Sequence, residues 1–149
     1  MLEKALAYLS AHNVMSLSTC GADGPWAAAV FYASRDFTLY FVSSPQSRHA
    51  RDLALDPRCA AAIHEDYRDW QAIRGLQLSG TVEPLEGVER DAALACYKAK
   101  FQFLDNPGAA LLAALGKAAC YRLTPRELYF VDNTTGFGKR ARVPVDLHG

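Results

Sequence analysis

Three consecutive polar residues, Ser47, Arg48 and His49, open a segment with helical periodicity directly after an apolar stretch. The first turn of a helix presents free N–H groups and a partial positive charge. A hydroxyl, a guanidinium and an imidazole at that end add donors and more positive charge, which costs stability unless an anion binds there. Phosphate is the ligand that such a helix end is expected to bind. The local alternative is that Arg48 pairs with Asp52, one turn later, on a solvated helix face.

The residues before this segment predict where the helix begins. Ser44 is of the type that caps a helix N-terminus, and Pro45 fits the first helical position because its missing N–H is not needed there. We therefore expect a helix over about residues 45–55, with Ser44 as its N-cap.

A second cationic candidate lies in the glycine-rich stretch of residues 133–140, which carries Lys139 and Arg140. It is not a P-loop, because the first glycine of that motif is replaced by Asn133 and the final Ser or Thr by Arg140. A glycine turn with an aromatic side chain and two cations can still close over a planar, phosphorylated ligand. An ordinary surface loop is the alternative.

The composition excludes several classes of function. Lys plus Arg is 16 and Asp plus Glu is 16, so the chain lacks the cationic excess of a general nucleic-acid binder. No apolar run approaches the roughly 20 residues that span a bilayer. The four cysteines have no zinc-site spacing, so we expect reduced thiols, no metal site and a cytoplasmic protein. No catalytic set has interpretable spacing, so no catalytic residue is assigned.

The hydrophobic pattern predicts one β-rich domain over residues 1–149, and an antiparallel barrel with helical inserts fits it best. The apolar parity of the longest predicted strand switches beside Gly75, which indicates a β-bulge there. Helices are expected at 2–12, 45–55, 86–101 and 107–115, and strands at 14–19, 26–34, 37–43, 58–65, 72–85, 118–123 and 126–132.

The predicted strand over residues 26–34 is apolar on both faces, which a small barrel with one wet face does not need. This pattern favours a homodimer. Alanine triplets at residues 27–29 and 60–62 leave room for a flat ligand or a second subunit, or else for tight packing inside a narrow barrel.

Four sequence markers, taken with this order of elements, resemble a known family. The markers are Ser47-Arg48-His49-Ala50, Ile73-Arg74-Gly75-Leu76-Gln77, Leu85-Glu86-Gly87 and Asp132-Asn133-Thr134-Thr135-Gly136-Phe137-Gly138-Lys139. The chain resembles the FMN-binding split barrel of the pyridoxamine 5'-phosphate oxidase-like superfamily, and more closely its YhbP-like bacterial branch, from about residue 3 to residue 142. The resemblance implies a six-stranded antiparallel split β-barrel that forms its site between two identical subunits.

The resemblance also implies roles for particular residues. The phosphate-binding Ser-Arg-Lys segment of the superfamily falls on Ser47, Arg48 and His49, so a histidine replaces the lysine, and the flavin-contacting end of the third strand falls on Ser43. Two cations that true oxidases carry on the second strand are replaced by Ala27 and Tyr32. The Arg-x-His motif that binds the vitamin substrate is absent, so oxidation of pyridoxamine 5'-phosphate is not expected.

Two functions from different classes follow. The first is an FMN-binding split barrel, with FMN-dependent oxidoreductase activity on a small-molecule substrate that the sequence does not identify. The second is a non-catalytic dimeric binding module that has lost flavin and holds another phosphorylated or planar ligand, haem included. Arg48 and the cationic tail, with Lys139 and Arg140, favour the first, whereas the missing second-strand cations favour the second.

Overall fold

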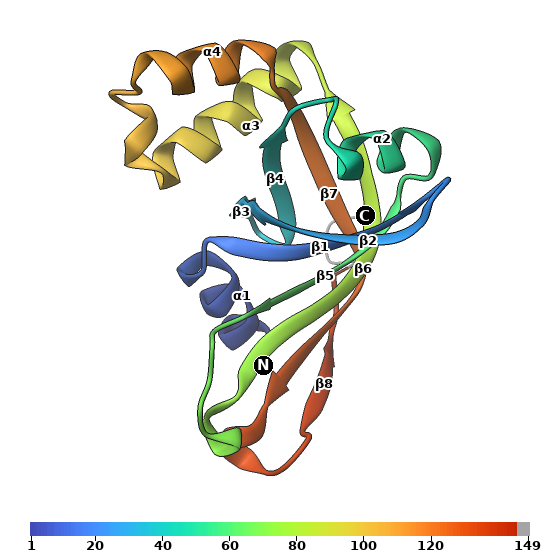
Figure 1. Ribbon diagram of the computed structural model, residues 1–149. Coiled ribbons are helices and arrows are strands. Elements are labelled where there is room, and N and C mark those ends of the chain that lie inside the picture. Colours follow the sequence, from blue (N-terminus) through green and yellow to red (C-terminus); the bar gives the residue numbers. More distant parts are fainter. Residues whose placement is uncertain (146–149) are drawn as a thin grey trace.

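The computed structural model describes residues 1–145 and consists of one antiparallel sheet curled into a half-barrel, with helices at its ends (Figure 1). The strands lie in the order β2-β1-β5-β6-β7-β4-β3, and β8 pairs with β7. The expected split-barrel fold is confirmed, although the sheet has eight strands, where six were expected. The strands are β1 (Val14–Gly21), β2 (Gly24–Phe31), β3 (Ala33–Arg35), β4 (Thr38–Ser43), β5 (Arg58–His64), β6 (Arg74–Leu85), β7 (Ala119–Asp132) and β8 (Arg140–Val143).

Residues 1–145 also contain four α-helices and three short 3-10 turns, of which α1 precedes the first strand and the others lie between strands. α1, α2 and α3 each pack against the sheet, and α4 lies beside α3 at one end of β4 and β7 (Figure 1). Within residues 1–145, no helix has the length and apolar character needed to cross a bilayer. The helical elements are α1 (Leu2–Ala11), α2 (Arg48–Leu55), η1 (Trp70–Ala72), α3 (Gly87–Lys100), η2 (Gln102–Leu104), α4 (Ala109–Lys117) and η3 (Asn133–Thr135).

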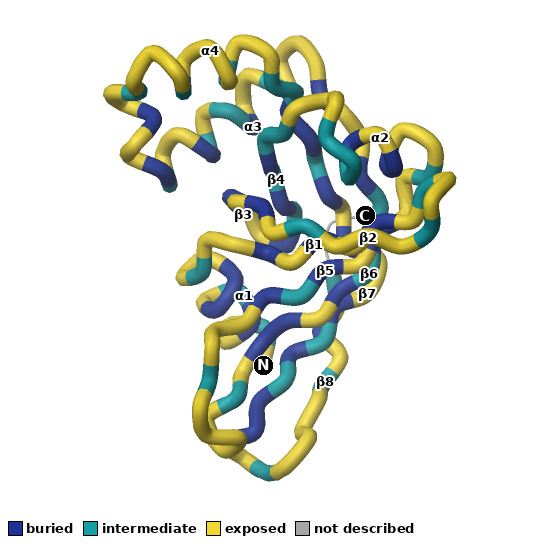
Figure 2. Tube along the Cα trace, viewed as in Figure 1, coloured by how far each residue is buried: buried dark blue, intermediate teal, exposed yellow. Residues whose placement is uncertain are grey.

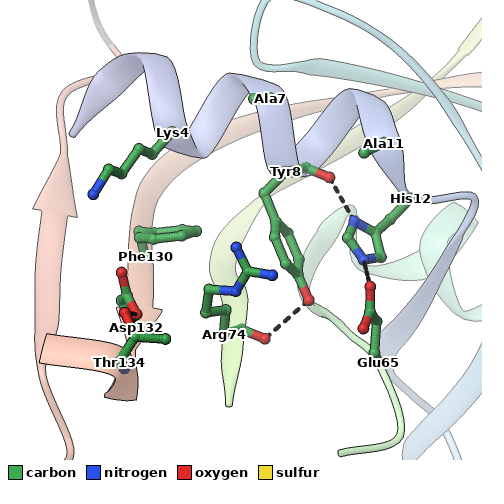
Figure 3. A pocket seen from close by; sticks show the side chains of 10 residues that line it. All are labelled: Lys4, Ala7, Tyr8, Ala11, His12, Glu65, Arg74, Phe130, Asp132 and Thr134. Atoms are coloured by element: carbon green, nitrogen blue, oxygen red, sulfur yellow. Dashed lines mark hydrogen bonds and ion pairs between the residues drawn. The ribbon is translucent and has the colours of Figure 1, made fainter. Parts of the chain in front are cut away.

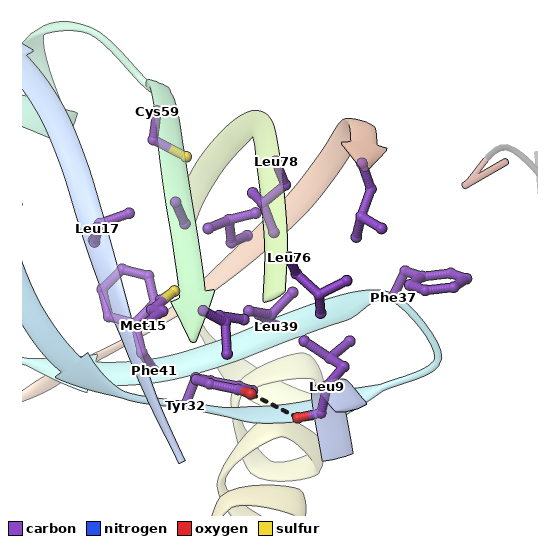
Figure 4. Packing of buried hydrophobic residues seen from close by; sticks show 14 of the residues in the cluster. Leu9, Met15, Leu17, Tyr32, Phe37, Leu39, Phe41, Cys59, Leu76 and Leu78 are labelled. Carbon is purple, nitrogen blue, oxygen red and sulfur yellow. Dashed lines mark hydrogen bonds between the residues drawn. The ribbon is translucent and has the colours of Figure 1, made fainter. Parts of the chain in front are cut away.

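The core lies inside the curled sheet because alternate side chains of each strand point to that face. In β1 the alternation is regular, and Met15, Leu17 and Thr19 are buried between exposed neighbours. Leucines and aromatics from the other strands meet them (Figure 4), and the buried stretches run through the middle of the sheet (Figure 2). Tyr32 is fully buried in this cluster, with its hydroxyl donating to the carbonyl oxygen of Leu9 at 2.6 Å.

Two expectations from the sequence were wrong, one about the C-terminal strands and one about the position of the bulge. The expected strands at 118–123 and 126–132 form one strand, β7, that runs through Pro125. The register break falls at Ser79/Gly80, where Glu127 pairs with Ser79 and Pro125 with Gly80, and not beside Gly75. The bulge leaves Arg126 of β7 without a partner, and the missing N–H of a proline is tolerated at such a break.

The start of α2 also differs from the expectation. The N-cap is Ser47, and the helix begins at Arg48. Ser44 forms a tight turn before it, since its carbonyl oxygen accepts from the Ser47 amide at 3.0 Å and its hydroxyl from the Gln46 amide at 3.1 Å. Pro45 therefore belongs to the turn. The shift of three residues places Ser47, Arg48 and His49 at the helix end itself.

Candidate functional site

The N-terminus of α2 presents unpaired donors. The hydroxyl of Ser47 accepts from the Ala50 amide at 3.3 Å and donates to the carbonyl oxygen of Ser44 at 2.7 Å. Across the described chain, the amides of Arg48 and His49 have no hydrogen-bond acceptor. Two N–H groups thus face outward at the positive end of a helix dipole, which is the arrangement that binds anions in proteins.

Arg48 is held in place by contacts with the β1–β2 hairpin. Its guanidinium carbon lies 4.2 Å from the centre of the Trp26 ring, a cation–π contact, and one terminal nitrogen donates to the carbonyl oxygen of Asp23 at 3.4 Å. Its Nε lies 3.9 Å from a carboxylate oxygen of Asp52, beyond hydrogen-bond distance. That Nε is buried and has no hydrogen-bond partner among residues 1–145. A buried N–H of a cation without an acceptor is a costly arrangement in the absence of a ligand.

Asp52 forms the ion pair with Arg48 that their spacing offered as the alternative, but it is buried and does not lie on a solvated face. Its carboxylate accepts from the hydroxyl of Thr19 at 2.9 Å, and its exposed fraction is 6%. Gly21 makes this approach possible, because a Cβ there would stand 2.0 Å from a carboxylate oxygen. The hydrogen bond between Asp52 and Thr19 therefore links α2 to β1 and holds the first turn of α2, with Arg48, in place against the sheet.

His49 lies between two hydroxyls. Its Nε2 is 2.8 Å from the hydroxyl of Ser43 and 3.3 Å from that of Ser47. Burial lowers the pKa of His49 below its ordinary value, although the nearby Asp52 charge acts in the opposite direction. The structure therefore brings together Ser43, Ser47, Arg48 and His49, with the imidazole held neutral in the free protein at neutral pH.

This lowered pKa predicts a pH dependence of stability. Between the lowered folded value and about 6.5, the unfolded chain binds the proton at position 49 more readily than the folded one. The free energy of unfolding of the ligand-free protein should therefore fall as pH drops below about 6.5, and His49→Gln should reduce that dependence. Urea unfolding at several pH values measures it. His64→Gln, at an exposed histidine of β5, is the control, and identical pH profiles for wild type and His49→Gln would contradict the prediction.

The other two candidate residues lie elsewhere in the chain. Lys139 and Arg140 precede and begin β8, at the end of the sheet opposite α2 (Figure 1). The guanidinium of Arg140 lies 4.4 Å from the centre of the Tyr129 ring, beside an open cavity of about 310 Å³ that Gln77 and Glu127 also line. A single copy of the chain does not bring this cavity to the N-terminus of α2.

The two positions where the family's cations are missing have different surroundings, and Tyr32 lies just past the end of β2. Ala27 is exposed on β2, whereas the Tyr32 side chain points into the core and cannot reach a ligand at the surface. Sequence reasoning missed the contributions of Trp26, Asp23 and Thr19. An exposed tryptophan close to a hairpin turn was the one available signal, since an aromatic face pairs readily with a guanidinium. Over residues 1–145, no group of three His, Cys, Asp or Glu side chains is placed to hold a metal ion.

Known proteins place the chain in a family. The family model described as pyridoxamine 5'-phosphate oxidase matches residues 1–132. The UPF0306 protein YhbP of Escherichia coli O157:H7 is 31% identical over 117 residues, which cover 77% of this chain and 74% of that protein.

Two solved structures share the fold. A heme binding protein from Mycobacterium smegmatis has a TM-score of 0.79 and 26% identity, and the match covers 97% of this chain but 58% of that one. HutZ, a heme storage protein from Vibrio cholerae, has a TM-score of 0.71 and 18% identity, with 85% and 91% covered. With the family model spanning most of the sequence, the chain belongs to the pyridoxamine 5'-phosphate oxidase family, in its YhbP-like branch.

Proposed function

We propose that the N-terminus of α2 binds the phosphate of a phosphorylated planar cofactor, and that this cofactor is FMN. The observation that carries the proposal is the N-terminus of α2, where two unpaired amides lie beside Arg48, whose buried Nε has no hydrogen-bond partner and stands 3.9 Å from the Asp52 carboxylate. A phosphate oxygen satisfies several such donors at once, and hydrogen bonds between ions are about twice as strong as neutral ones. The donor set therefore fits a phosphate.

Each residue has a definite role in this proposal. Arg48 and the amides of Arg48 and His49 would hold the phosphate, and the Ser47 hydroxyl would orient them as it caps the helix. A bound dianion favours the imidazolium form of His49, so that side chain would become a further donor as pH falls. FMN, when bound, supplies the redox chemistry, and the chain supplies binding and orientation.

The homodimer belongs to the same proposal. β2 is an edge strand, and most of its residues are exposed, with Trp26 44% and Phe31 48% exposed. A second copy that covers this strand would bury both aromatics. In the family arrangement it would also bring Lys139 and Arg140 toward the α2 site of the first copy.

The dimer gives a direct prediction. Light scattering at micromolar concentration should give twice the chain mass of 16.3 kDa. Trp26→Ser should shift the protein toward monomer, because it removes a large apolar side chain from the proposed interface. Leu55→Ser is the control, at an exposed leucine on α2. A wild-type mass of one chain at these concentrations would overturn the dimer.

Haem is the second candidate ligand. The printed names of two solved structures with this fold describe haem binding or haem storage. The loss of second-strand cations at Ala27 and Tyr32 also weakens the case for FMN. Haem carries carboxylates, which Arg48 could bind in place of a phosphate. In this version the protein is a cytoplasmic binding module without flavin chemistry.

Absorbance titrations distinguish the two candidates. Purified protein is titrated with FMN, riboflavin and haemin in parallel, and retained ligand is measured after desalting. FMN binding should be tighter than riboflavin binding, and the complex should be yellow. Haemin binding without retention of either flavin would replace FMN with haem, and equal affinities for FMN and riboflavin would remove the phosphate from the proposal.

A further inference from the structure

A second cavity lies at the opposite side of the barrel from the α2 site, between α1 and the ends of β5, β6 and β7. Its volume is about 480 Å³, within the range of small-molecule sites. Figure 3 shows side chains from these separate elements converging on it. Its lining includes Arg74 and Asp132, which belong to two of the sequence markers of the branch.

α1 contributes one continuous face to this cavity. Lys4, Ala7, Tyr8, Ala11 and His12 recur at the three- and four-residue spacing that places side chains on one side of a helix. The two alanines leave open space between the cation at one end of the stripe and the ring pair at the other. The cavity therefore depends on the small side chains of Ala7 and Ala11, on a helix face whose other residues are large.

The aromatic wall of the cavity is rigid. The rings of Tyr8 and His12 stack with centroids 3.9 Å apart, and Phe130 meets Tyr8 edge-on at 5.9 Å. The Tyr8 hydroxyl donates to the carbonyl oxygen of Arg74 at 2.9 Å and lies 3.0 Å from the Tyr67 hydroxyl. Burial and the hydrogen bond with Tyr67 raise the pKa of Tyr8, so it stays a neutral hydroxyl. These contacts fix the floor of the cavity, where Tyr8 is 6% and Phe130 3% exposed, so a flat ligand would meet only a small part of each ring.

Both carboxylates of the cavity already have protein partners. Glu65 is 2.9 Å from Nε2 of His12, whose Nδ1 is 2.7 Å from the carbonyl oxygen of Tyr8. Both imidazole nitrogens thus lie within hydrogen-bond distance of an oxygen. Asp132 accepts from the amide of Thr134 at 2.9 Å and from its hydroxyl. These bonds lower the pKa of Asp132, and the charges of Lys4 and Arg74 lower it further.

The two cations have no such partners. Over residues 1–145, neither Lys4 nor Arg74 has a carboxylate within 4.0 Å, and neither side chain donates a hydrogen bond. In Figure 3 they lie on either side of the Phe130 ring, and the Arg74 guanidinium is 6.0 Å from the centre of the Tyr8 ring. Two unpaired cations beside an aromatic wall suit a ligand that is anionic at one end and flat at the other.

We propose that this cavity binds a small aromatic anion, with its carboxylate or phosphate between Lys4 and Arg74 and its ring against Tyr8 and Phe130. Carboxylate and phosphate share the chemistry that the two cations recognise. An arginine offers either group a planar fork of donors, and a lysine adds a point charge. Within one copy of the chain the site lies apart from the α2 site, on different elements, and it contains none of the residues proposed to hold FMN.

The test measures the binding of four probes to the full chain by calorimetry and by NMR of the backbone amides. Benzoate and phenyl phosphate carry both the ring and the charge, benzyl alcohol carries the ring alone, and inorganic phosphate the charge alone. We expect benzoate or phenyl phosphate to bind at least tenfold more tightly than the two partial probes. Amide shifts should concentrate in α1 and at the start of β6, which separates this site from binding at α2.

Three variants locate the binding. Arg74→Gln and Lys4→Gln should each weaken it by roughly tenfold, whereas Arg35→Gln, at an exposed arginine of β3, should leave it unchanged. Ala7→Phe should block it by filling the cavity while both cations remain. Thermal unfolding shows that each variant is folded. Equal binding of benzoate and benzyl alcohol, full binding by folded Ala7→Phe, or shifts confined to α2 would each overturn the proposal.

Discussion

Replacing Arg48 with alanine is expected to weaken FMN binding by roughly ten- to a hundredfold and to leave riboflavin binding nearly unchanged. A hydrogen bond to a charged group contributes on the order of 1.5–3 kcal/mol, which converts to that range of affinity. Riboflavin has no phosphate, so it loses nothing when the guanidinium is removed. Fluorescence titration of wild type and variant with both flavins measures the two ratios.

The interpretation depends on keeping the rest of the site intact. Arg48→Ala also removes the charge beside buried Asp52, whose hydrogen bond from Thr19 remains. Thermal unfolding should therefore accompany the titration. Arg51→Ala is the matched control, an exposed arginine of the same helix, and it should change neither affinity by more than a fewfold. Equal losses for FMN and riboflavin in Arg48→Ala would assign the residue to the ring pocket or the fold, and the phosphate site would be withdrawn.

Gly80→Ala should destabilise the protein by about 1–3 kcal/mol, the range of an overpacked core. A Cβ at Gly80 would stand 2.4 Å from the carbonyl oxygen of Thr124 and 3.0 Å from Cα of Pro125. Both contacts are with backbone, so no flexible side chain can move aside. The strain falls at the register break between β6 and β7, the pair of strands with the longest pairing in the sheet.

Urea unfolding followed by circular dichroism measures this loss. Gly116→Ala is the matched control, since Gly116 lies within α4 and a Cβ there meets nothing within 4 Å. Alanine is the better helix former, so the control should stabilise α4 by up to about 1 kcal/mol. An unchanged unfolding midpoint for Gly80→Ala would show that β7 moves away from β6 at the bulge.

Local patterns in the sequence were sufficient to predict most of the sheet. β1 alternates with period two, so its burial followed directly from Met15 and Leu17. Local patterns could not predict β7, because Pro125 reads as a strand breaker until the bulge opposite Gly80 is known. The N-cap was misplaced for a similar reason. Ser44 and Ser47 are chemically equal caps, and only the turn geometry selects Ser47.

The sequence could predict only those residues of the candidate site that are neighbours in the chain. Ser47, Arg48 and His49 are consecutive, so their shared position needed no tertiary information. The spacing of four residues indicated Asp52 as a partner of Arg48. Trp26 reaches Arg48 only through the packing of α2 on the β1–β2 hairpin, which no local pattern indicates. The cavity beside α1 could not be predicted either, for the same reason. The stripe from Lys4 to His12 reads as an ordinary amphipathic helix until Arg74 and Asp132 are placed opposite it.

The position of β7 in the sheet has a consequence for the order in which the protein can form. β7 pairs with β6 along its length and with β4 and β8 on its other side, so one late segment joins most of the strands. Ser43, at the end of β4, pairs with Ala119, 76 positions later in the chain. Such long-range pairing closes a large loop and is slow. A chain emerging from the ribosome therefore cannot pair β4 with the main sheet until β7 has been made, and a product truncated before β7 would lack the cavity beside α1, which Phe130 and Asp132 line.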